Sequence, residues 1–175
     1  MDVQLYSEVI HTITNNINTM QKITPCLWFD NQLEEAISFY TSVFPDLEVL
    51  NINRYPEGTP HLAGKILTAM FRMAGQDFIA INGGPLFRFT EAVSFSIDCK
   101  DQDEIDYYWA KFLEGGEESY CGWLKDKFGL SWQIVPSELG AWLYNQDPAK
   151  ARSAMQAMLK MRKIDISALK QAIQE

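Results

Sequence analysis

The sequence predicts an α+β protein built from two βαβββ modules and a C-terminal group of helices. Two observations support this prediction: apolar and polar residues alternate as in half-buried strands, and the order strand-helix-strand-strand-strand occurs twice. The modules are expected over residues 22–85 and 91–136, where they pair to close one sheet. A helical tail follows over 137–175, and residues 1–21 form an N-terminal extension.

The first module begins with a strand at residues 23–29. Asn31 and Glu34 resemble a capping box that opens a helix, and Pro45 ends that helix. The helix presents one apolar face, made of Leu33, Ala36, Ile37, Tyr40 and Phe44. Three further strands are expected at residues 47–55, 65–73 and 77–82.

The second module repeats this order. Residues 93–97 alternate strictly, and Asp101 with Glu104 caps the following helix. Residues 121–125 and 130–135 then form a hairpin around Asp126, Lys127 and Gly129. Trp123 and Trp132 lie on the two arms, where their rings are expected near each other.

The tail shows three helix starts. Ser137 is expected to cap a short helix, Asp147-Pro148 begins the next, and Asp165 caps the last.

Charge and cysteine content exclude several classes of function. A net charge of −8 and a pI near 4.8 argue against nucleic acid or an anionic membrane as partner. Cys26, Cys99 and Cys121 lack CxxC spacing and are odd in number, which favours reduced thiols in a cytoplasmic protein. No apolar run approaches the roughly 20 residues of a membrane span, and the N-terminus is a poor signal peptide.

Several stretches together resemble one family. They are LEEAISFY, ITPCLWFD, GQDFIAINGGP, FTEAVSFSIDCKDQDEIDYYW, CGWLKDKFGLSWQIVP and MLKMRKIDISALKQAI. They resemble the PhnB-like family, labelled "3-demethylubiquinone-9 3-methyltransferase", of the vicinal oxygen chelate superfamily that includes glyoxalase I and bleomycin-resistance proteins. The resemblance covers roughly residues 22–173. It implies a cupped half-barrel per module, a ligand inside the cup, and a homodimer.

Strand alternation then predicts which side chains face the cup. The expected sets are Thr24, Cys26 and Trp28; Ala92, Ser94 and Ser96; and Ser131, Gln133 and Val135.

The resemblance also implies four metal positions, on the first, fourth, fifth and eighth strands. In this chain they are Thr24 (or Ile23), Ala80, Ala92 and Gln133. Only Gln133 offers a side-chain oxygen suited to the site, and it is neutral, so we expect no metal and no cofactor.

Neither methyl transfer nor a thiol nucleophile is favoured. The glycine pair after the fourth strand runs into Pro85 and not into a helix, unlike the nucleotide-binding turn of common methyltransferases. No histidine is placed by the sequence to activate a cysteine.

Aromatic walls with a few polar points remain, as in small-molecule pockets. The predicted ligand-binding residues are Trp28, Asn82, Ser94, Trp123 and Gln133. We therefore expect a metal-free protein that binds a small organic molecule. Two alternatives stay open: a metal- or substrate-assisted enzyme of the glyoxalase/dioxygenase class, and a structural protein whose own side chains fill the cup.

Overall fold

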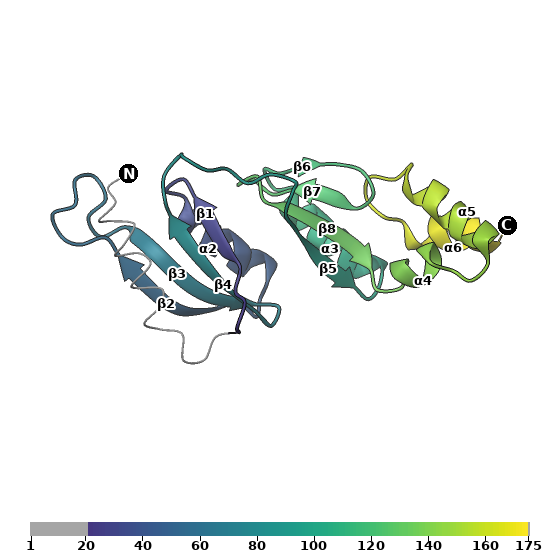
Figure 1. Ribbon diagram of the computed structural model, residues 1–175, viewed down its shortest axis with the longest axis horizontal. Coiled ribbons are helices and arrows are strands. Elements are labelled where there is room, and N and C mark those ends of the chain that lie inside the picture. The colour runs from purple at the N-terminus through teal and green to yellow at the C-terminus, as the bar shows by residue number, and fades with distance from the viewer. Residues whose placement is uncertain (1–20, 175) are drawn as a thin grey trace. The chain divides into compact units, whose positions relative to one another are not determined.

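The computed structural model describes residues 21–174 and divides into two compact units, one ending at Arg88 and the other beginning at Phe89. Each unit has one four-stranded sheet, ordered β1-β4-β3-β2 (sheet A) or β5-β8-β7-β6 (sheet B) (Figure 1). In both, the first strand pairs parallel with the last, and the other pairs are antiparallel. This repetition confirms the predicted α+β class. The predicted extension, apart from Gln21, lies outside the described residues.

The first unit packs one helix on sheet A. Its elements are β1 (Cys26–Phe29), α2 (Leu33–Val43), β2 (Glu48–Arg54), β3 (Ile66–Met73) and β4 (Gln76–Asn82). Leu27 and Phe29 pair with Ala80 and Asn82, so these side chains share one face of the sheet. We call it the helix face, because α2 covers it (Figure 1). The buried side of α2 consists of Leu33, Ala36, Phe39, Tyr40 and Val43.

The start of α2 differs from the prediction. Asn31 adopts φ 60°, and its amide donates to the carboxylate of Asp30 at 3.1 Å. The N–H of Leu33 instead donates to Oδ1 of Asn82, at 3.0 Å. The predicted capping box of Asn31 and Glu34 is therefore wrong, because a side chain from a distant strand supplies the acceptor.

The second unit packs α3 on sheet B. Its elements are β5 (Ser94–Cys99), α3 (Gln102–Phe112), β6 (Glu117–Glu118), β7 (Trp123–Lys125) and β8 (Ser131–Pro136). The predicted cap is confirmed: the N–H of Glu104 donates to Oδ1 of Asp101 at 3.0 Å. The Phe112 ring stacks on the Trp132 ring with centroids 4.5 Å apart, which places Trp132 on the helix face of sheet B.

The turn between β7 and β8 is organised by a buried carboxylate. Gly129 has φ 85°, as a tight reversal requires. Asp126 is buried, and it accepts hydrogen bonds from the N–H groups of Phe128 (2.9 Å) and Leu130 (3.0 Å). Its other oxygen accepts from Nε1 of Trp132 at 3.0 Å. The turn was predicted, but its anchoring to the core was not.

Three helices follow β8: α4 (Leu139–Leu143), α5 (Pro148–Met158) and α6 (Ile166–Gln174). Asp147 and Asp165 cap α5 and α6 as predicted, each accepting a backbone N–H at 2.9 Å. Ser137 does not cap α4, because its hydroxyl donates to the carbonyl of Cys99 at 3.1 Å. None of the described helices is long and apolar enough to cross a bilayer.

Candidate functional site

The open face of sheet B, opposite α3, gathers polar side chains from three adjacent strands. Alternation and register assign to it Ser94 and Ser96 of β5, Ser131, Gln133 and Val135 of β8, and Trp123 and Lys125 of β7. This confirms the predicted cup-facing set on β8. Gln133 pairs with Ser96 on one side and with Trp123 on the other, and its Nε2 donates to Oγ of Ser94 at 2.9 Å. Three of the predicted ligand residues, Ser94, Trp123 and Gln133, therefore lie together.

Ser131 belongs to the same face and was missing from the predicted ligand residues. It is 1% exposed, and its hydroxyl has no hydrogen-bond partner among the residues that the structure describes. Ser94 pairs with it on one side and Lys125 on the other. The alternation of β8 placed Ser131 beside Gln133, but only the tertiary structure shows that its hydroxyl is both buried and unsatisfied.

Lys125, the register partner of Ser131 on β7, brings a positive charge to the open face of sheet B. Its Nζ forms an ion pair with the carboxylate of Glu91, which lies just before β5, and Glu117 of β6 is its register partner. The hydrogen bond from Lys125 holds the pKa of Glu91 below its ordinary value, and the same bond raises the pKa of Lys125. Both groups therefore stay charged at neutral pH.

The rings of Trp123 and Trp132, which were expected near each other, lie on opposite faces of sheet B. Trp123 pairs with Gln133, whereas Trp132 pairs with Leu124, so the two indoles point to opposite faces of sheet B. Trp132 is buried in the core, and Trp123 remains partly exposed on the open face. The expected proximity is wrong, because their positions differ by one step in the strand register.

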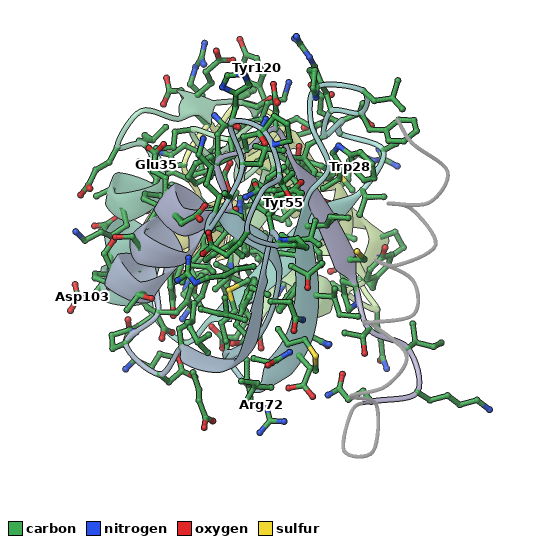
Figure 2. The ribbon with its side chains drawn as sticks, turned by 90° about the vertical axis from the view of Figure 1, so that its left-hand side faces the viewer. Trp28, Glu35, Tyr55, Arg72, Asp103 and Tyr120 are labelled. Atoms are coloured by element: carbon green, nitrogen blue, oxygen red, sulfur yellow. The ribbon has the colours of Figure 1, made fainter. Side chains whose placement is uncertain are left out.

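On sheet A, Trp28 occupies the open face and is held by the segment after β4 (Figure 2). Its Nε1 donates to the carbonyl of Gly84 at 2.8 Å. The Phe87 ring packs edge-on against the indole, with ring centroids 5.0 Å apart. A Cβ on Gly83 would lie 2.2 Å from the indole, so only glycine allows this packing. The polar group of Trp28 is thus already engaged.

Much of the rest of this face is buried, in contrast with sheet B. The buried side chains are Thr68 and Met70 of β3 and Ile79 and Ile81 of β4. Toward the edge strand, Nδ2 of Asn53 donates to Oγ1 of Thr68 at 3.0 Å. Arg72, at the end of the sheet away from Trp28, pairs with buried Asp77 at 2.6 Å (Figure 2). Fewer groups remain available to a ligand here.

Asn82 lies on the helix face of sheet A, apart from the open-face residues. It is 2% exposed, and besides accepting from Leu33 its amide donates to the carbonyl of Ile66 at 2.8 Å and to Glu34 at 3.4 Å. Tyr55 donates to its carbonyl at 2.8 Å. The side chain joins β4, β3 and α2.

The implied metal positions do not fit a divalent cation. Ala80 pairs with Leu27 and so faces α2, not the open face, where β4 presents Ile79 and Ile81. No group of three or more His, Cys, Asp or Glu side chains in residues 21–174 is arranged to hold a metal ion. Gln133 is the one implied position with a suitable oxygen; its Nε2 donates to Ser94, and a single neutral amide oxygen does not make a divalent-metal site.

The Cys99 thiol and the glycine pair after β4 show no arrangement suited to nucleophilic attack or nucleotide binding. Burial, reinforced by the nearby Glu104, Asp98 and Asp101 carboxylates, raises the pKa of the Cys99 thiol to about 12. Such a thiol is protonated at neutral pH and is a poor nucleophile. The segment after Gly83-Gly84 leads to β5 without an intervening helix.

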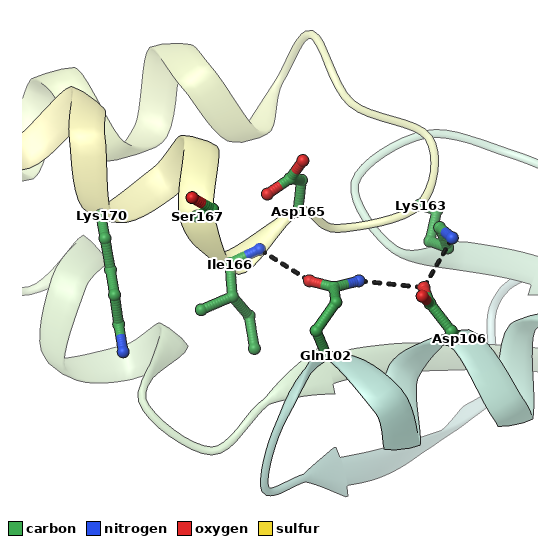
Figure 3. A pocket seen from close by; sticks show the side chains of 7 residues that line it. All are labelled: Gln102, Asp106, Lys163, Asp165, Ile166, Ser167 and Lys170. Atoms are coloured by element: carbon green, nitrogen blue, oxygen red, sulfur yellow. Dashed lines mark hydrogen bonds and ion pairs between the residues drawn. The ribbon is translucent and has the colours of Figure 1, made fainter.

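A separate open pocket of about 440 Å³ lies between α3 and the start of α6 (Figure 3). Gln102 spans it: its Oε1 accepts from the N–H of Ile166 at 2.9 Å, and its Nε2 donates to Asp106 at 3.0 Å. Lys163 pairs with Asp106 at 2.6 Å, and Lys170 pairs with Glu138 at 3.2 Å. Gln102 and the Lys163–Asp106 pair thereby attach the tail to α3, whereas the Lys170–Glu138 pair joins two parts of the tail.

Comparisons with known proteins bear on the chain's family. The family model described as 3-demethylubiquinone-9 3-methyltransferase matches residues 21–135. A PhnB protein from Bacillus cereus is 37% identical, with a TM-score of 0.61 over 66% of this chain and 99% of that one. A protein from Pseudomonas aeruginosa is 22% identical, with a TM-score of 0.52 over 66% and 97%.

A more distant similarity concerns the fold alone. The fosfomycin resistance protein FosX from Listeria monocytogenes, solved with Mn(II) and sulfate, is 15% identical, with a TM-score of 0.50 over 70% of this chain and 94% of that one. No curated protein matches the chain.

Proposed function

Because the chain belongs to the 3-demethylubiquinone-9 3-methyltransferase family, the PhnB-like branch of the vicinal oxygen chelate superfamily, we propose that it binds a small organic molecule on the open face of sheet B, without a metal ion. One observation carries the proposal. Trp123, Gln133 and Ser94 present an aromatic surface and hydrogen-bonding groups side by side, next to the unsatisfied hydroxyl of Ser131. Methyl transfer is not proposed, since the described chain offers no glycine-rich turn into a helix.

Sheet B is favoured over sheet A by exposure. Ser96 is exposed, and Ser94, Trp123 and Gln133 are partly exposed, whereas Thr68, Met70, Ile79 and Ile81 on the open face of sheet A are buried. This difference supports the filled-cup alternative for sheet A only. On sheet A, Trp28 would contribute an apolar surface to the open face. Asn82 would not contact a ligand and would act indirectly, by positioning β4 against α2.

Native mass spectrometry of the untagged protein, purified without chelator, is the first test. We expect a homodimer, as the superfamily resemblance implies, without stoichiometric metal and with an additional organic mass on part of the population. About one metal ion per subunit would instead favour the enzyme alternative. The absence of any organic mass, together with no rise in Tm across a broad metabolite screen, would favour the structural alternative.

Matched substitutions test the site itself. Gln133→Ala and Trp123→Ala should each weaken binding of the co-purified molecule at least about tenfold, as expected when a polar contact or an aromatic surface is lost. Gln156→Ala and Trp142→Ala, which change the same residue types on the C-terminal helices, should leave binding unchanged. Equal binding by all four variants would refute the assignment.

The compartment is proposed on thiol chemistry. Cys26 is exposed, and Cys26, Cys99 and Cys121 are all free, which suits a reducing environment. We propose a cytoplasmic protein, to be tested by fractionation of the cells that produce it.

A further inference from the structure

We propose that the molecule bound on sheet B is a small organic carboxylate, whose carboxylate replaces that of Glu91 at Lys125 and accepts a hydrogen bond from Ser131. This inference rests on the proposed binding function and names the chemical class of its ligand. It concerns one row across the sheet, in which Ser94, Ser131 and Lys125 are successive register partners. Neighbouring strands of a sheet lie about 4.8 Å apart, so groups on adjacent members of such a row are within reach of one carboxylate.

The Ser131 hydroxyl is the first support. A buried hydroxyl without a partner is disfavoured, and most buried polar groups in proteins are satisfied by protein, water or ligand. Ser131 is 1% exposed and has no partner in the described part of the chain, and alternation directs it to the open face. An oxygen acceptor placed over this row would satisfy it.

The ion pair between Lys125 and Glu91 is the second support. The two side chains are 35% and 63% exposed, so their pairing contributes little to stability and can be exchanged. Glu91 lies outside the strands, in the turn that leads into β5, and its carboxylate already contacts Lys125. A carboxylate can therefore occupy this place, and a ligand group of the same kind can substitute for it.

The neighbouring charges select a monoanion. Glu117 pairs with Lys125 in the register of β6 and β7. The pKa of Lys125 is raised first by its hydrogen bond to Glu91 and further by the negative charges of Glu91 and Glu117. When a carboxylate displaces Glu91, the charge next to Lys125 is unchanged. A dianion would add a second negative charge close to Glu117, which like-charge repulsion disfavours.

Trp123 indicates what the rest of the ligand is like. It stands on the same face of β7 as Lys125, two residues away, or about 7 Å along the strand. Gln133, its register partner, adds a hydrogen-bonding group at that distance. The row thus fits a carboxylate attached to a short aromatic or apolar body.

The test uses phenylacetate and its neutral counterpart phenylacetamide as probes, with binding followed by the NMR signals of the Ser131 amide and the Trp123 indole. We expect phenylacetate to bind at least about tenfold tighter than the amide. Lys125→Gln should abolish this preference, and Lys125→Arg should keep most of it. Glu91→Gln should tighten phenylacetate binding about threefold to tenfold, because it removes the competing carboxylate of an exposed ion pair.

If the ligand replaces Glu91, Glu91→Gln should strengthen phenylacetate binding and Lys125→Gln should weaken it. If the ion pair only holds the structure together, both variants should change binding in the same direction. Lys150→Gln, at an exposed position of α5, is the matched control and should change nothing. Equal binding of both probes, unaffected by Lys125→Gln, would overturn the carboxylate inference while leaving the proposed binding function standing. If neither probe perturbs these signals, the inference is also refuted, and native mass spectrometry then judges the binding function separately.

Discussion

Replacement of Asn82 by alanine tests the hydrogen-bonded junction of the first unit. The substitution leaves the N–H of Leu33 without its acceptor at 3.0 Å and the carbonyl of Ile66 without its donor at 2.8 Å. Each buried group left unsatisfied costs about 1–3 kcal/mol, so Asn82→Ala should lower the free energy of unfolding by about 2–5 kcal/mol. That is a large part of the total of about 5–15 kcal/mol that holds an ordinary domain folded.

Urea unfolding monitored by circular dichroism measures this loss, and amide hydrogen exchange should show faster exchange at Leu33 and along α2. Asn53→Ala is the matched control, because it removes one partly buried hydrogen bond to Thr68 on the same sheet. We expect it to cost only about 1 kcal/mol. A loss for Asn82→Ala below about 0.5 kcal/mol, or equal to that of Asn53→Ala, would refute the reasoning.

Asn82→Asp separates the two hydrogen bonds. An ionised carboxylate keeps the acceptor for Leu33 but directs its second oxygen at the carbonyl of Ile66 and toward Glu34. This variant should be at least as unstable as Asn82→Ala at pH 7, and it should regain stability in acid, where a protonated carboxyl group can donate to Ile66. Stability that does not depend on pH would contradict this geometry.

Three further predictions concern other buried contacts. Asp126→Asn places an amide N–H against Nε1–H of Trp132 and should lower the free energy of unfolding by about 2 kcal/mol. In a protein that already carries Trp132→Phe, the same substitution should cost less, and a double-mutant cycle of urea unfolding would measure the difference. The pKa of the folded Cys99 thiol is raised to about 12, above its ordinary 9.0, so the unfolded state loses that proton first as pH rises. Between pH 9.0 and about 12 this thiol should lower the unfolding free energy by about 1.4 kcal/mol per pH unit, a slope that denaturation at stepped pH would reveal. Gly83→Ala forces a methyl group against the Trp28 ring and should destabilise the protein by about 1–3 kcal/mol in thermal unfolding.

Each of these has its own control. Cys99→Ala should abolish the additional slope in alkali, and an unchanged slope would show that the thiol does not cause it. Gly140→Ala, in α4 with open space around the added methyl, should be neutral or slightly stabilising, unlike Gly83→Ala. Additive losses at Asp126 and Trp132 would show that their hydrogen bond contributes nothing.

The sequence by itself determined the repeated topology and most of the open face of sheet B. Period-two alternation in β5 and β8 is a local property, so it assigned Ser94, Ser131 and Gln133 to one face before any fold was known. The caps at Asp101, Asp147 and Asp165 were predictable for the same reason, since each acceptor lies within three residues of its donor.

Only the tertiary structure decided where groups distant in sequence meet. Asn82 caps α2 by accepting from the N–H of Leu33, which lies 49 positions earlier in the chain, and no local pattern encodes that bond. The buried, unsatisfied state of Ser131 and the ion pair between Lys125 and Glu91 likewise depend on neighbours brought in from other segments. Alternation along a strand predicts which face of the sheet a residue occupies. Its hydrogen-bond partners and its burial depend on neighbours from other segments, which the register and packing of the whole sheet decide.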